Sequence, residues 1–278
     1  FLLPSLVGNP QFLFLLLAGI FWCVDKRLGL SLALVLLLSG YINQSLKELL
    51  AVPRPSGPGI VPLGEWEGYA LPSGHAQTTT SVWGYWGVRL SRWWVWGVVV
   101  TVVGLVALSR VYQAAHYPGD VVAGILVGAL VVILYLRGWT FLVSRFESWP
   151  VTGQIALAAG ASLLLALGAP GEQALSASGV LLGISTGWIL EERYLRIEIS
   201  GRWSQYGGRL LVGGAGLGVL QGLEVLLGEV PGVELLTPIA LGVWVTLGAP
   251  ALFLVGRLTR RRELSAIHPS MAHSAPIV

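Results

Sequence analysis

Three short strings of polar residues lie between residues 47 and 120 of a chain that is otherwise mostly apolar. They supply fixed cations, backbone amides at a possible helix start, and two imidazoles. These are the groups that phosphoryl transfer without a metal requires, because most of its catalysis is positioning and charge stabilisation. The strings contain Lys47, Arg54, Pro55, Pro72, Ser73, Gly74, His75, Ser109, Arg110, His116 and Asp120.

The first predicted component is a phosphate-binding pocket. A proline directly before Ser73 and Gly74 favours a helix that starts here, with the amides of its first turn and that of Ser73 pointing at an anion. The Ser73 hydroxyl adds a further donor. Guanidinium groups grip phosphate oxygens as planar forks, and an ammonium adds a point charge. We therefore predict that phosphate is bound by Lys47, Arg54, Ser73, Gly74 and Arg110.

The second predicted component is a pair of histidines that divide the covalent work. Asp120 follows His116 by four residues, so its carboxylate can hold one ring nitrogen protonated while the other attacks phosphorus. His75 is left to protonate the leaving oxygen and later to activate water. The other two histidines, His268 and His273, lie in a polar tail and are not assigned a role.

The composition indicates a membrane protein. Hydrophobic residues make up 54% of the chain and charged residues 11%, whereas roughly a quarter of the residues of a soluble domain are charged. Apolar runs of about 20 residues, enough to cross a bilayer, recur along its length. We predict an all-α, polytopic membrane helix bundle of about nine spans. Their approximate bounds are 10–24, 28–46, 76–91, 93–113, 119–137, 151–169, 175–190, 208–227 and 235–256.

The distribution of lysine and arginine predicts the orientation. With the N-terminus outside, all but three of the 17 basic residues fall on the inner side, as the positive-inside rule requires. The three exceptions are Lys47, Arg54 and Arg110, which are the cations of the motifs. We predict a multi-pass plasma (inner) membrane protein with its site outside and its C-terminus in the cytoplasm. Its net charge of +3 reflects orientation and anionic lipid, so nucleic acid is not an expected partner.

The chain divides into three predicted regions. Residues 1–137 contain every motif and about five spans, residues 151–256 form four further spans, and residues 257–278 form a basic cytoplasmic tail. The stretch 53–72 is rich in proline and glycine, so it is predicted to run over the outer surface. We expect it to include a short interfacial helix near Glu65 and Trp66.

Two residue types are assigned to packing and anchoring. Glycines at 213, 214, 216 and 218 superficially match a nucleotide-binding loop, but no strand precedes them, and small residues on a spanning helix favour close packing. Tryptophans such as Trp22, Trp66 and Trp93 fall near predicted span ends, where their rings are expected to anchor the helices at the headgroup level.

With these motifs, the sequence resembles the type 2 phosphatidic acid phosphatases (PAP2). Their superfamily includes lipid phosphate phosphatases, glucose-6-phosphatase and the vanadium haloperoxidases. The resemblance covers residues 30–137 and implies a haloperoxidase-like helical core. It implies that His116 forms a phosphohistidine, that Asp120 is its partner and that His75 is the acid. It also implies that no metal or other cofactor is needed.

The substrate has two possible classes. Most of the family acts on lipids, which favours a lipid phosphate reached among the membrane lipids: phosphatidic acid, phosphatidylglycerol phosphate or an isoprenyl diphosphate. Nine spans with the first motif after the second span, however, look more like the glucose-6-phosphatase branch, so a soluble sugar phosphate is the alternative. A lipid transporter with a vestigial phosphatase core is a third hypothesis. It is disfavoured because every catalytic position of the motifs still has its catalytic residue.

Overall fold

The computed structural model describes residues 8–64, 66–146, 148–168, 172–228, 230 and 232–262. In this part of the chain all the elements are helices, apart from one isolated antiparallel bridge between Ile197 and Arg261. The α-helices are α2 (Pro10–Cys23), α3 (Lys26–Leu50), α4 (Gly74–Leu90), α5 (Trp93–Tyr112), α6 (Pro118–Phe146), α7 (Val151–Gly168), α8 (Glu172–Leu190), α9 (Trp203–Leu227), α10 (Val233–Val243) and α11 (Ala249–Val255). Two π-helical turns, η1 (Glu191–Leu195) and η2 (Trp244–Gly248), continue α8 and join α10 to α11.

The all-α membrane bundle is confirmed, but the count of nine spans is not. Among the described residues, seven helical segments are long and apolar enough to cross a membrane: Lys26–Leu50, Trp93–Tyr112, Pro118–Gly138, Val151–Gly168, Ala174–Leu195, Trp203–Leu227 and Val233–Val255. Helix α2 has 14 residues and α4 has 17, so both are too short to qualify by length. Both nevertheless lie where spans are predicted.

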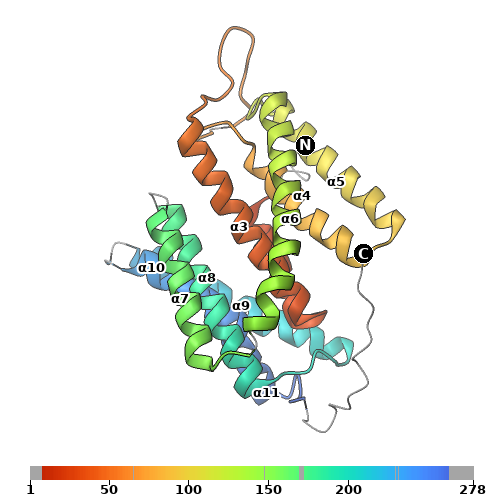
Figure 1. Cartoon of the computed structure of the whole chain (residues 1–278), viewed down its shortest axis with the longest axis vertical. Helices are drawn as coiled ribbons and strands as arrows, with labels where there is room; N and C mark the ends of the chain where they lie inside the picture. The colour runs from red at the N-terminus through yellow and green to blue at the C-terminus, as the bar shows by residue number, and fades with distance from the viewer. Residues whose placement is uncertain are drawn as a thin grey trace.

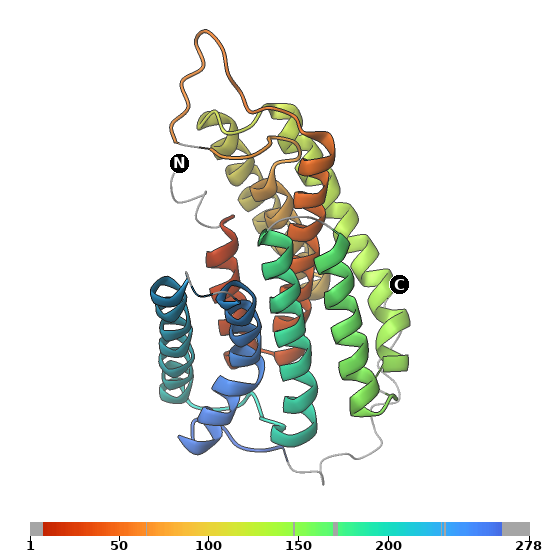
Figure 2. The same cartoon turned by 90° about the vertical axis from the view of Figure 1, so that its left-hand side faces the viewer.

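The helices form two adjoining groups. Helices α3 to α6 stand together, and α7 to α11 lie beside them toward the other end of the molecule (Figure 1). The long connection between α3 and α4 projects from one end of the bundle (Figure 2). Its described residues contain no helix before α4 begins, so the predicted interfacial helix near Trp66 is wrong.

Helices α2 and α3 join the two groups. One hydrophobic cluster contains Leu17 and Leu32 and extends onto α4 and α6. A second cluster contains Phe21 and Leu30 and extends onto α8, α9 and α11. At Gly29 an added Cβ would lie 2.7 Å from the Phe21 backbone, so glycine allows α2 and α3 to approach this closely. The described helices therefore pack across the boundary between the two predicted regions.

Two glycines bring α6 against the start of α4. An added Cβ would lie 2.6 Å from the Ser73 carbonyl oxygen at Gly124, and 2.5 Å from the Gln77 carbonyl oxygen at Gly128. Small residues four positions apart let spanning helices approach to backbone contact. The sequence analysis did not single out these glycines, although they hold α6 against the first turn of α4, and both helices carry motif residues.

The glycines of α9 have the packing role predicted for them at two positions. The Trp22 ring occupies the space beside Gly213, and the Trp244 ring occupies the space beside Gly216. Trp22 also donates from Nε1 to the Val245 carbonyl at 2.8 Å and is only 2% exposed. The expectation that Trp22 anchors a helix at the headgroups is therefore wrong, because its ring fills the helix interface.

Candidate active site

The predicted site residues lie in or next to the long connection between α3 and α4, at the neighbouring ends of helices. Lys47 is in the last turn of α3, Arg110 is in the last turn of α5, and Ser73 precedes α4. Arg54, Lys47 and His75 are all close enough to act electrostatically on His116. Segments separated by up to 73 positions (47 to 120) thus form one cationic cluster.

A buried polar network holds the start of α4 against α3. Asn43 donates from Nδ2 to the Pro72 carbonyl at 3.1 Å and to Gln77 Oε1 at 2.9 Å. Gln77 donates in turn to the Ser39 carbonyl at 2.7 Å. Hydrogen bonds of this kind are important inside a membrane, because water cannot satisfy the buried groups. The sequence analysis missed Asn43 and Gln77; their only signal is an amide side chain within an apolar run.

The first turn of α4 is arranged partly as predicted. The Ser73 amide donates to the Asp120 carbonyl at 2.9 Å, so the expectation that it points at an anion is wrong. The amides of Gly74 and His75 belong to the first helical turn, where N–H groups have no partner within the helix. An added Cβ at Gly74 would lie 2.9 Å from Asn43 Oδ1, which favours glycine here.

The Ser73 hydroxyl is fully buried and has no hydrogen-bond partner in the described part of the chain. It makes no capping bond to α4 either. An unsatisfied buried hydroxyl costs roughly 1–3 kcal/mol. The Ser73 hydroxyl is therefore suited to donate a hydrogen bond to a bound ligand.

His116 lies in the turn before α6, beside the first-turn residue Asp120. Its Nδ1 is 3.8 Å from Asp120 Oδ2, which is beyond hydrogen-bonding distance, and it has no hydrogen-bond partner among the described residues. Asp120 Oδ2 accepts from the Tyr117 amide at 2.8 Å. Catalytic hydrogen bonds are often long without a substrate and shorten when it binds.

The environment keeps His116 neutral. Burial is the main cause that lowers its pKa from 6.5 to about 3, and the positive charges of Arg54 and Lys47 contribute to the same shift. A backbone hydrogen bond with Ala70 opposes this shift. The ring is therefore uncharged at pH 7, so its contact with Asp120 is not an ion pair and it retains a lone pair for attack.

Arg54 is held by the loop that carries it. Its Nη1 donates to the Ala115 carbonyl at 3.0 Å, and its Nε and Nη2 donate to the Glu67 carbonyl at 3.0 and 2.6 Å. Burial lowers the pKa of the guanidinium, and the charge of Asp120 opposes that change. These contacts place a fixed cation directly beside the residue that precedes His116.

Arg110 is positioned by residues outside the motifs. Its Nη2 donates to Gln113 Oε1 at 2.9 Å, and its guanidinium lies over the Trp66 ring, 5.4 Å from the centroid. The Gln113 carbonyl accepts from the Leu63 amide at 3.2 Å and from Trp66 Nε1 at 3.4 Å. Gln113 thus connects Arg110 to the connection between α3 and α4, a role that the sequence analysis did not identify. The Trp66 ring covers the Arg110 guanidinium, and this contact was not part of the anchoring role predicted for Trp66.

Comparison with known proteins agrees with this arrangement. Residues 28–143 match the model of the PAP2 superfamily, and residues 175–261 match the transmembrane extension of PAP2 superfamily phosphatases. Phosphatidylglycerophosphatase B of Bacillus subtilis (strain 168) is 30% identical over 159 residues, which are 53% of this chain and 71% of that protein. The chain belongs to the PAP2 superfamily. The motifs of residues 47–120 all lie inside the matched PAP2 region.

Other relatives of this PAP2 protein differ in their named substrates. Human (Homo sapiens) sphingosine-1-phosphate phosphatase 2 is 33% identical over 152 residues, 51% of this chain and 38% of that protein. Glucose-6-phosphatase catalytic subunit 1 of Haplochromis nubilus is 28% identical over 185 residues, 54% of this chain and 52% of that protein. The chain thus spans less than half the length of the mammalian sphingosine-1-phosphate phosphatases it matches. No solved structure matches it significantly.

Proposed function

We propose that this chain is an integral-membrane phosphatase that hydrolyses the phosphate monoester or diphosphate of a lipid through a phosphohistidine. The observation that carries the proposal is the buried Ser73 hydroxyl, which has no hydrogen-bond partner in the described chain, in the same cluster as His116, whose Nδ1 faces Asp120 at 3.8 Å. Both residues belong to the same cluster as three cations, an arrangement suited to a bound phosphate.

The cluster matches the charge of the transition state. Arg54, Arg110 and Lys47 would surround the equatorial phosphate oxygens, while the first amides of α4 and the Ser73 hydroxyl donate to them. Donors that are already oriented stabilise developing charge without reorganisation, which is the main source of catalysis in phosphoryl transfer. The bound anion would also offset the cations that keep the His116 pKa low.

The proposed reaction has two steps. In the first, a neutral His116 nitrogen attacks phosphorus and the P–O bond to the lipid breaks. His75 delivers a proton to the leaving oxygen; burial and the cations lower its pKa to about 4, and the bound phosphate anion would offset those cations so that His75 can be protonated. In the second, His75 takes a proton from water, the water oxygen attacks phosphorus, and the N–P bond breaks to release phosphate. Asp120 stabilises the positive charge that His116 acquires.

A lipid substrate is favoured over a soluble sugar phosphate. Several relatives carry lipid phosphates in their names, and the cluster lies at one end of helices that are long enough to span a bilayer. We place that end on the outer side of a plasma (inner) membrane, because the remaining lysines and arginines belong almost entirely to the opposite end. The glucose-6-phosphatase match makes sugar phosphate the competing class.

The decisive experiment measures phosphate release by the purified protein and by His116→Ala. We expect the substitution to reduce release by about a thousandfold or more, because the covalent intermediate is lost. Tyr117→Phe, at the half-exposed neighbour, is the matched control and should retain activity. Rapid quenching with labelled substrate should trap a protein-bound phosphate that is labile to acid, stable to base and absent from His116→Ala.

A substrate panel distinguishes the two classes. Phosphatidic acid, phosphatidylglycerol phosphate and an isoprenyl diphosphate are compared with glucose 6-phosphate at equal concentration. A higher kcat/KM for glucose 6-phosphate would contradict the lipid assignment while leaving the phosphohistidine mechanism intact. Substantial release by His116→Ala would contradict the mechanism itself.

A further inference from the structure

A cavity lies at the opposite end of the bundle from the candidate active site. Its volume is about 630 Å³, within the range typical of ligand sites. One of its lining residues, Arg27, is at the start of α3, whereas Lys47 of the active site is near the end of the same helix. Twenty residues of α-helix separate them, a rise of about 30 Å. The two sites therefore lie at opposite membrane surfaces.

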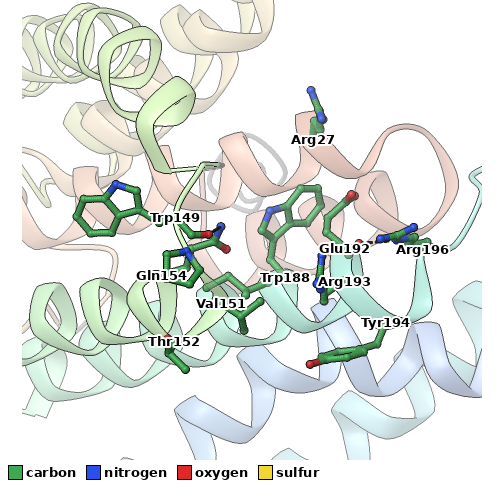
Figure 3. A pocket seen from close by; sticks show the side chains of 12 residues that line it. Arg27, Trp149, Val151, Thr152, Gln154, Trp188, Glu192, Arg193, Tyr194 and Arg196 are labelled. Atoms are coloured by element: carbon green, nitrogen blue, oxygen red, sulfur yellow. Dashed lines mark hydrogen bonds between the residues drawn. The ribbon is translucent and has the colours of Figure 1, made fainter. Parts of the chain in front are cut away.

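The lining of this cavity is basic and aromatic. Its charged members are Arg27, Arg193, Arg196 and Glu192, and its aromatic members are Trp149, Trp188 and Tyr194. Figure 3 shows that these side chains come from the start of α3, the turn before α7, and the end of α8 with η1. Among the described lining residues the one acidic side chain, Glu192, has its Oε1 2.9 Å from Lys26 Nζ, a cation that it shares with Glu191. The described lining therefore carries more positive than negative charge.

Two features give the cavity a defined shape. Arg196 is in the left-handed conformation at the end of η1, and its Nε donates to the Glu192 carbonyl at 3.1 Å, which orients the guanidinium. On the opposite side, Gln154 donates from Nε2 to the Trp149 carbonyl at 3.1 Å, which joins the turn to the first part of α7.

The surroundings of the cavity are those of a bilayer surface. Trp149 is 48% exposed and Tyr194 is 63% exposed, as expected for rings at the headgroup level. The neighbouring helix α7 exposes Leu157, Leu163 and Leu164 along its length. A ligand with a phosphate head and acyl chains fits these surroundings. Its phosphate would contact the arginines, and its acyl chains would lie along such a helix. Basic pockets between spanning helices suit anionic lipid headgroups.

We propose that this cavity, on the surface opposite the active site, binds the headgroup of an anionic phospholipid. The ligand is a phosphodiester lipid, so it is chemically distinct from the terminal phosphate that the proposed reaction consumes. The cavity holds it in place as a bound lipid rather than as a substrate.

The test measures binding of dioctanoyl phosphatidylglycerol to the purified full chain by native mass spectrometry, with dioctanoyl phosphatidylcholine as the zwitterionic comparison. We expect the anionic lipid to bind at least tenfold more tightly than phosphatidylcholine. Arg193→Glu and the double variant Arg193→Gln/Arg196→Gln should lose most of this preference. Arg260→Gln/Arg261→Gln, on the same surface but outside the cavity, should retain it within twofold.

Two results would overturn the proposal. One is equal binding of the anionic lipid by the wild-type chain and by Arg193→Glu, with both proteins showing the same thermal unfolding. The other is binding of inorganic phosphate or glycerol phosphate as tightly as phosphatidylglycerol with the same dependence on the arginines, which would identify a site for soluble anions. Neither measurement depends on phosphatase activity.

Discussion

At the scale of single residues, the surroundings of His116 suit the nucleophilic role that we propose for it. Burial and the neighbouring cations act in the same direction on its pKa, which falls to about 3. A neutral ring needs no base to activate it. The same cations that would hold the phosphate thus also prepare the group that attacks it.

This shift predicts a dependence of stability on pH. Above pH 6.5 the ring is neutral in both the folded and unfolded states, so it has no effect there. Between pH 6.5 and about 3 the unfolded chain takes up a proton that the native site resists, so stability is lost as the pH falls. We expect the unfolding temperature in detergent to drop less steeply over this range for His116→Gln than for wild type. Parallel curves would contradict the assigned pKa.

A second prediction at this scale concerns Gln113, which we regard as a positioning residue. Gln113→Leu removes the acceptor of Arg110 Nη2, and a hydrogen bond to a charged group contributes about 1.5–3 kcal/mol. We expect KM to rise about tenfold or more, with a smaller change in kcat. Gln113→Glu, which keeps an acceptor, should restore most of the affinity. An unchanged KM in Gln113→Leu would show that Arg110 does not need this support.

At the scale of elements, the contact between α4 and α6 positions the site. Gly124 and Gly128 place α6 within backbone contact of α4, and the Ser73 amide bonds the Asp120 carbonyl at the point where both helices begin. Asp120, the proposed partner of the nucleophile, and the turn proposed to bind phosphate are therefore positioned by the same contact. A shift of either helix would move both groups.

The glycine contact can be tested with alanine. Gly124→Ala and Gly128→Ala each place a methyl group 2.5–2.6 Å from a backbone oxygen of α4, and overpacking of this kind costs about 1–3 kcal/mol. We expect both variants to unfold at lower temperature and to lose activity. Gly138→Ala, on the same helix with open space around it, is the control and should resemble wild type. If all three variants had the same unfolding temperature and activity, α4 and α6 would be free to move apart without loss.

At the scale of the whole molecule, a buried ion cluster connects the start of α3, directly before the PAP2 region, to the transmembrane extension. Lys26 of α3 is 7% exposed, and its Nζ lies 2.8 Å from Oε2 of the fully buried Glu191 in η1. The Ile197 amide also donates to Glu191, at 2.8 Å. The two predicted regions are thus joined by charge as well as by the shared packing of α2 and α3.

Breaking this cluster should destabilise the whole molecule. Lys26→Met leaves the Glu191 carboxylate buried with its main cation removed, and loss of one partner of a buried pair costs about 3–5 kcal/mol. We expect a clear fall in the unfolding temperature, measured by thermal aggregation in detergent. Lys26→Met/Glu191→Gln removes both charges and should recover part of the loss. A double variant less stable than Lys26→Met would contradict this account.

The membrane class, the approximate helix positions and the residues of the candidate site could be predicted from the amino-acid sequence. Apolar runs and motif spacing are local properties, so they can be recognised without coordinates. Three features became visible only in the three-dimensional structure: the Ser73 amide is already hydrogen-bonded, Gln113 supports Arg110, and Trp22 is buried. Helices that are apolar on every side show no periodicity to indicate which face packs, and contacts between distant residues depend on that choice.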